Sequence, residues 1–174
     1  MAQTVRFRLD PETVSALRAL RSRLPRHLAA VDEPTVTVAA ATAIPPPARA
    51  ALEAGLSLLV LPSIWLATLG TVAGRPDELV LAAVVDAELL AVHAAVHDAL
   101  AGRVKGPVAA YLPGAWLPHC VLATERPAEA FAALHPVTPV RARVVGVEVS
   151  GVRGGTLVEV ARPPAAAPWP APGS

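Results

Sequence analysis

Residues 34–38 read PTVTV and residues 118–122 read PHCVL, and these two stretches decide how the chain folds. Each begins at a proline, which a strand tolerates at its first residue, and continues with the β-branched and apolar residues that strands favour. We therefore predict two short strands that occupy equivalent places in the two halves of the chain.

The side chains of these strands divide between two faces, because successive residues of a strand point to opposite sides. Thr35 and Thr37 share one face of the first strand, and His119 and Val121 share one face of the second. Cys120 faces away from His119, so the two cannot form a nucleophile–base pair. We predict Cys120 to be a small core residue.

The flanking segments repeat in the same order, which indicates a duplicated strand–helix–strand–short helix unit. The matching pairs are strands 5–9 and 79–85, helices capped by Asp10 and Asp86, and short helices 45–55 and 127–134. We predict that Gly102 ends the helix that Asp86 caps. Chance similarity between alanine-rich helices is the alternative. A duplication would bring the two motif strands together at a pseudo-twofold axis, where their faces would line one shared cleft.

The remaining apolar segments complete an α+β domain. Further strands are expected at 56–61, 64–69, 140–149 and 156–161, the last two joined by a glycine-rich turn at 151–155. We predict one two-lobed domain over residues 1–162, with lobes at about 1–74 and 75–162, and a Pro/Ala-rich disordered tail over 163–174.

Composition excludes several classes of protein. Of the 174 residues, 53% are hydrophobic but only 3% are aromatic, so the core must consist of Ala, Val and Leu. The net charge of +1 gives no strong electrostatic field that would attract the chain to nucleic acid or acidic membranes. A single cysteine excludes an internal disulfide and a thiolate zinc site. We expect a cytoplasmic protein, because no basic-then-apolar leader is present.

An uncharged run over residues 54–74 has two interpretations. It approaches the length of a membrane-spanning helix, but Pro62 lies near its middle, and Arg75-Pro76-Asp77 is typical of a turn. Two buried strands joined by a turn account for the same residues, and we expect no membrane association.

Other polar groups carry weaker signals. His93 and His97 lie four residues apart on a predicted helix, a spacing that can hold a metal, but the sequence offers no third ligand. We interpret them as a partly exposed helix face. Residues 151–155 could cradle a phosphate, although a hairpin turn is favoured. Paired arginines on a strand in each half could bind a phosphodiester or could be exposed strand surface: Arg6, Arg8, Arg141 and Arg143.

The two motif strands resemble the signature strands of the two-histidine phosphoesterases, a superfamily that includes 2′-5′ RNA ligase-like proteins and cyclic phosphodiesterases. Its signature is His-x-Thr/Ser, once in each lobe, and the likeness in element order covers roughly residues 3–162. The resemblance implies duplicated antiparallel sheets with helices outside and a central cleft. It also implies a phosphodiester of RNA or of a nucleotide as ligand, and neither metal nor cofactor.

The chain departs from this signature at two positions. Thr35 stands where the family has its first histidine, and Val121 stands at the second hydroxyl position, so only Thr37 and His119 match. In the family one histidine is the general base and the other the general acid, while the hydroxyls hold phosphate oxygens. Loss of one such group typically lowers the rate by about 10²–10⁴-fold.

The resemblance therefore predicts His119 as the single catalytic residue, with Thr35 and Thr37 binding substrate. We expect a weak phosphoesterase acting on cyclic or 2′-5′ phosphodiesters. With one histidine of two, the sequence leaves open whether the chain is an enzyme. The alternatives are a phosphate-ligand-binding module without catalysis and an interaction protein of the same fold. The oligomeric state is also open.

Overall fold

The computed structural model describes residues 2–151 and 156–158. The helices are α1 (Pro11–Ser22), α2 (Pro46–Leu56), α3 (Ala87–Leu100) and α4 (Pro127–Leu134), with a 3₁₀ turn, η1 (Ala109–Tyr111). The strands are β1 (Gln3–Leu9), β2 (Thr35–Ala43), β3 (Ser63–Val72), β4 (Arg75–Val84), β5 (Lys105–Pro107), β6 (His119–Ala123), β7 (Val140–Ser150) and β8 (Thr156–Val158).

The strands form one antiparallel sheet in the order β5-β2-β1-β7-β3-β4-β6, with β8 paired to β7. Without the short strands β5 and β8, the order is β2-β1-β7-β3-β4-β6. If each strand is replaced by its counterpart in the other half (β1 and β4, β2 and β6, β3 and β7), the result is the same order read backwards. The topology therefore has the symmetry expected of a duplicated unit. The last strand of each half pairs with the first strand of the other half, β3 with β4 and β7 with β1. β7 joins the two halves, because it pairs with β3 near its start and with β1 farther along.

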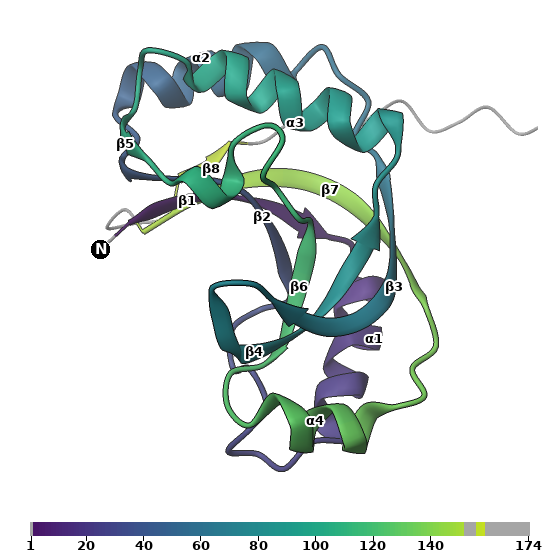
Figure 1. Cartoon of the computed structure of the whole chain (residues 1–174). Coiled ribbons are helices and arrows are strands. Elements are labelled where there is room, and N and C mark those ends of the chain that lie inside the picture. The colour runs from purple at the N-terminus through teal and green to yellow at the C-terminus, as the bar shows by residue number, and fades with distance from the viewer. Residues whose placement is uncertain (1, 152–155, 159–174) are drawn as a thin grey trace, which may run out of the picture.

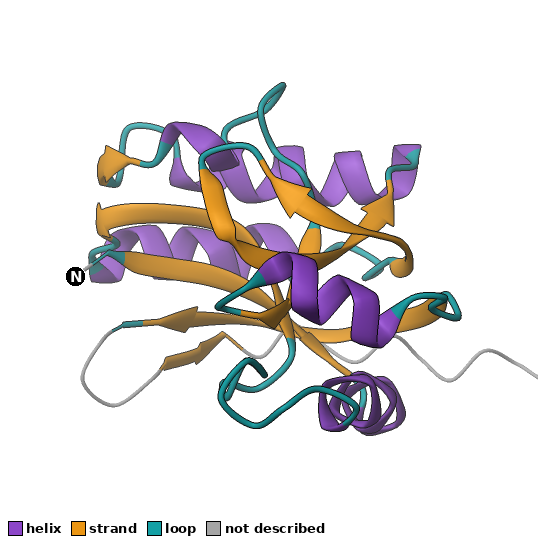
Figure 2. Cartoon of the chain, turned by 60° about the horizontal axis from the view of Figure 1, so that its bottom comes forward, coloured by secondary structure: helices purple, strands orange, loops and turns teal. Residues whose placement is uncertain are grey.

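The helices cover the outside of this sheet (Figure 1). α2 and α3 pack on each other over the half that contains β1, β2 and β5, and α1 and α4 pack against the half that contains β4 and β6. Figure 2, turned so that the bottom of Figure 1 comes forward, shows helices both in front of the strands and behind them. The buried core is mainly Val, Leu and Ala, as the composition predicts.

Local signals explain several helix ends. The carboxylate of Asp86 accepts a 2.8 Å hydrogen bond from the Leu89 backbone N–H and so caps α3, as predicted. Gly102, with φ of 69°, follows the end of this helix. Asp10 occupies the same position before α1 but does not cap it. Its carboxylate instead accepts from the Thr13 hydroxyl and from the backbone N–H of Arg143 on β7.

Two local predictions are wrong. Residues 56–61 are not a strand, because α2 continues to Leu56 and the chain then runs irregularly with Leu58 and Val60 mostly exposed. Residues 75–77 are not a turn but the start of β4: Val72 pairs with Arg75, and Gly74, with φ of 82°, closes the hairpin between them.

No helix within the described ranges is long and apolar enough to cross a membrane. Of the predicted strand 156–161, residues 156–158 form β8, and residues 159–161 lie outside the described ranges, as does the predicted tail over 163–174.

Candidate functional site

The motif strands β2 and β6 are far apart along the sheet path, yet side chains from neighbouring segments link them. The indole N–H of Trp116 donates a 2.9 Å hydrogen bond to the Thr37 carbonyl of β2. From α1, the buried guanidinium of Arg21 donates to the Val121 carbonyl of β6 at 2.6 Å and to the carbonyl of Asp32, just before β2. The sheet therefore curls until its two motif strands lie next to each other.

Cys120 lies on β6 with its side chain in the core, as predicted from the alternation of this strand. Its side chain is fully buried, and burial raises the pKa of its thiol to about 11, against the opposing effects of Arg21 and a hydrogen bond from the Thr35 backbone. The thiol is therefore neutral at physiological pH and takes no part in chemistry.

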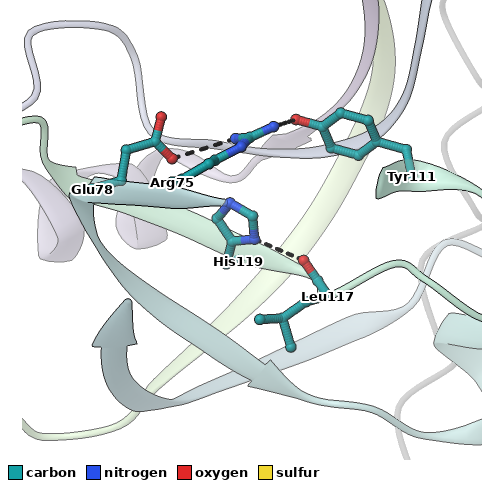
Figure 3. A network of polar contacts seen from close by, with 5 residues as sticks. All are labelled: Arg75, Glu78, Tyr111, Leu117 and His119. Atoms are coloured by element: carbon teal, nitrogen blue, oxygen red, sulfur yellow. Dashed lines mark hydrogen bonds and ion pairs between the residues drawn. The ribbon is translucent and has the colours of Figure 1, made fainter. Parts of the chain in front are cut away.

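His119 begins β6, and the backbone fixes its tautomer. Its Nδ1 lies 2.7 Å from the Leu117 carbonyl oxygen (Figure 3). A carbonyl can only accept, so Nδ1 carries the hydrogen, and in the neutral ring Nε2 keeps its lone pair. His119 is buried, with 9% of the residue exposed. The ring is positioned to accept a proton at Nε2.

Arg75 lies beside this imidazole and is held by two further side chains. Figure 3 shows the Nε2 edge of His119 facing the guanidinium of Arg75, which lies at the start of β4. Arg75 forms an ion pair with Glu78 at 3.3 Å and donates a hydrogen bond to the Tyr111 hydroxyl. Glu78 is also on β4, and Tyr111 ends the turn η1.

The surroundings of His119 favour its neutral form. Burial lowers the pKa of His119 because it disfavours the imidazolium, and the positive charge of Arg75 lowers it further. The hydrogen bond to Leu117 and the negative charge of Glu78 act in the opposite direction but do not cancel the shift. At neutral pH the ring is therefore an unprotonated base.

Thr35 and Thr37 lie half-buried on the β2 face that carries arginines of β1. The register places Arg8 opposite Thr35 and Arg6 opposite Thr37. Within residues 2–151, neither threonine hydroxyl has a hydrogen-bond partner. Thr35 opens onto a cavity of about 160 Å³ whose polar lining consists of Arg6, Arg8, Asp32, Glu33, Thr35 and Glu148.

The structure thus groups the predicted residues into two polar sites on neighbouring strands. Thr35 lies with Arg6 and Arg8, and His119 lies with Arg75 and does not line the 160 Å³ cavity. That Thr35, Thr37 and His119 converge on one groove stays a prediction. Sequence reasoning missed Arg75, Glu78 and Tyr111, although Tyr111 is the one tyrosine of the chain.

The interpretation of His93 and His97 as a partly exposed helix face is wrong for His93. This side chain is 2% exposed, stacks on the Trp116 ring at 4.0 Å and hydrogen-bonds the Tyr111 carbonyl through Nε2 at 2.9 Å. His97 contacts the Val38 carbonyl at 3.3 Å. Burial, together with the nearby His97, lowers the pKa of His93. These histidines brace α3 against β2, and no metal-binding cluster of three or more such ligands occurs in the described ranges.

The arginines of β7 lie away from both polar sites. Arg141 and Arg143 are exposed, and Arg143 approaches the Asp10 carboxylate at 3.9 Å. They belong to exposed strand surface. Of the glycine-rich segment 151–155, only Gly151 is described, with φ of 89°.

Comparison with known proteins finds a likeness in structure alone. No family model and no curated protein sequence matches the chain. Among solved structures, it is similar to the crystal structure of the MHV ns2 PDE domain, a two-histidine phosphoesterase-fold protein, with a TM-score of 0.58 and 15% identity over 85% of this chain and 96% of that one. The resemblance predicted from the motif strands is therefore confirmed at the level of architecture: this chain has the α+β fold of the two-histidine phosphoesterases.

Proposed function

We propose that the chain is a weak phosphoesterase acting on cyclic or 2′-5′ phosphodiesters of RNA or nucleotides, with His119 as its proton-transfer residue. The observation that carries this proposal is the fixed tautomer of His119. Its Nδ1 is committed to the Leu117 carbonyl at 2.7 Å, which leaves Nε2 as a base beside the cationic Arg75. The fold, similar to that of a viral PDE domain, agrees with such chemistry.

In the proposed hydrolysis, Nε2 of His119 takes a proton from the attacking water as the new P–O bond forms. The P–O bond to the ribose oxygen breaks, and that oxygen takes a proton from solvent. In the family a second histidine supplies this proton, but Thr35 has no titratable group near neutral pH. We therefore expect a rate about 10²–10⁴-fold below that of a site with both histidines.

Thr35 and Thr37 are proposed to bind phosphate oxygens. The support is that neither hydroxyl is used within residues 2–151 and that the cavity at Thr35 also holds Arg6 and Arg8, beside the carboxylates of Asp32, Glu33 and Glu148. Arginine and hydroxyl donors are the groups that phosphate oxygens favour.

The second candidate is a binding module that holds a phosphorylated ligand without turning it over. The substitution of Thr35 for the first motif histidine favours it, because binding needs only the donors, whereas catalysis needs proton transfer in both directions.

Assays on 2′,3′-cyclic nucleotides and on 2′-5′-linked oligonucleotides separate these functions. The control for His119→Ala is His27→Ala, because His27 is exposed whereas His119 is buried. Turnover lost in His119→Ala and kept in His27→Ala supports the enzyme. Binding without turnover in the unaltered chain supports the module, and absence of both leaves only an interaction protein of the same fold.

A further inference from the structure

We infer that Arg75 is the anion-binding residue of the His119 site and binds a non-bridging oxygen of the phosphate beside Nε2. This inference rests on the proposed function and assigns it a residue outside both motif strands. It begins from the guanidinium that faces the imidazole in Figure 3.

The guanidinium is held in place from two sides. It donates to the Tyr111 hydroxyl and to the Glu78 carboxylate at 3.3 Å, and its central carbon lies 5.4 Å from the centroid of the Tyr111 ring. Tyr111 is itself 7% exposed, so its position is fixed by packing. Arg75 is therefore oriented before any ligand arrives, which lowers the entropic cost of binding.

Arg75 has N–H donors left for a ligand. A guanidinium carries five N–H groups, and the two hydrogen bonds found among the described residues leave three of them for a ligand. The Arg75 side chain is 33% exposed, so an anion arriving from solvent can reach it. A phosphate bound there would lie next to Nε2 of His119.

The proposed phosphodiester hydrolysis needs a cationic group beside the phosphate. Negative charge grows on the phosphate oxygens as water attacks, and a neutral imidazole cannot stabilise that charge, whereas a preorganised guanidinium can. Val121 lacks the hydroxyl that the family signature has at its position, so the motif on β6 supplies no phosphate donor of its own.

Arg126 provides a comparison, because it forms an ordinary exposed ion pair. Arg126 pairs with Glu129 at the same spacing in sequence and the same 3.3 Å, but these side chains are 68% and 49% exposed. No hydrogen bond joins Arg126 to a buried tyrosine, whereas one joins Arg75 to Tyr111. Arg126→Gln is therefore a matched control for Arg75→Gln, with the same charge change and the same kind of carboxylate released.

The test is calorimetric titration of the full chain with 2′,3′-cyclic AMP and, separately, with inorganic phosphate. We expect Arg75→Gln to weaken both by about 10- to 100-fold, the loss typical of one charge-assisted hydrogen bond, and Arg126→Gln to change neither. Tyr111→Phe keeps the charge but releases the guanidinium, so we expect a smaller loss. Circular dichroism verifies that each variant is folded.

A second measurement tests, independently of ligand binding, whether Arg75 lies next to His119. In NMR titration of the His119 ring protons, Arg75→Gln should raise the His119 pKa by removing a nearby cation, and Glu78→Gln should lower it. Folded Arg75→Gln that binds both probes like the unaltered chain overturns the role of Arg75, whatever the activity of His119. If the unaltered chain neither binds nor turns over 2′,3′-cyclic AMP or any other phosphodiester, the proposed function is wrong and this inference with it.

Discussion

The indole N–H of Trp116 donates a 2.9 Å hydrogen bond to the Thr37 carbonyl, near the start of the motif strand β2. The same indole ring stacks on His93 of α3, with the two planes 5° apart. Trp116 lies three residues before His119. One side chain therefore links β2, α3 and the approach to β6, which fixes how the two polar sites lie relative to each other.

Replacing Trp116 with Phe should destabilise the fold, because the ring can still stack on His93 while the Thr37 carbonyl loses its donor. We expect a decrease of about 1–3 kcal/mol in the free energy of unfolding, measured by urea denaturation. Trp65→Phe is the control, since Trp65 is 46% exposed on β3, and we expect it to remain within about 0.5 kcal/mol of the unaltered chain. Equal effects of the two changes would contradict a structural role for the Trp116 hydrogen bond.

Cys120 should resist thiol reagents while the chain is folded. With its pKa raised to about 11 by burial, only about 10⁻³ of the thiol is thiolate at pH 8, and the side chain is fully enclosed. Reaction with a disulfide reagent should therefore be slow in buffer and reach the rate of a free cysteine in strong denaturant. A native-state rate equal to the denatured-state rate would show that Cys120 is not in the core.

Stability should fall as the pH falls below about 6.5. Burial lowers the pKa values of both His93 and His119 in the folded chain, while the unfolded chain keeps the ordinary value of about 6.5. Between the folded and unfolded pKa values, the unfolded chain binds more protons, so the free energy of unfolding decreases with acidification and is flat above this window. The titratable or charged neighbours are Arg75 and Glu78 at His119, and His97 at His93.

This dependence is measurable by urea denaturation between pH 5 and 7.5, a range in which exposed carboxylates contribute little. Each histidine adds a slope of up to about 1.4 kcal/mol per pH unit inside its window. His93→Gln should remove the contribution of His93 and so reduce the combined slope. Stability that rises as the pH falls toward 5 would have the wrong sign for two buried neutral histidines.

Restoring the family signature should raise turnover. The double change Thr35→His with Val121→Thr supplies the second imidazole and the missing hydroxyl, and we expect about 10²–10⁴-fold faster hydrolysis of a 2′,3′-cyclic nucleotide. The same double change combined with His119→Ala is the control and should remain inactive. If a folded double variant gains nothing, the two motif strands do not share a catalytic site.

Much of the fold could be predicted from local signals, because strand alternation and helix capping act over a few residues. The motif strands, the cap at Asp86 and the stop at Gly102 are of this kind. Residues 56–61 were mispredicted because a short apolar run is equally compatible with a helix end and with a strand, and only tertiary packing decides between them. Asp10 fails as a cap because β7, far along the sequence, offers its carboxylate a better partner.

The candidate site was predictable only in part, for a related reason. His119 carries its own signature, but its partners do not. Arg75 and Tyr111 are 36 residues apart and meet only once the β3–β4 hairpin and η1 are in place. The same holds for His93. Nothing in the sequence indicates that this helix residue stacks on the Trp116 ring.

The central place of β7 affects how this molecule can assemble. Six strands precede β7 in the chain, and they form two sets, β5-β2-β1 and β3-β4-β6. Among the described strands, β7 is the one that pairs with both sets. During synthesis each set would expose an unpaired edge, on β1 and on β3, until residues 140–150 emerge. The closing of the sheet is thus a late, long-range event, and a nascent chain would be most vulnerable to aggregation just before it.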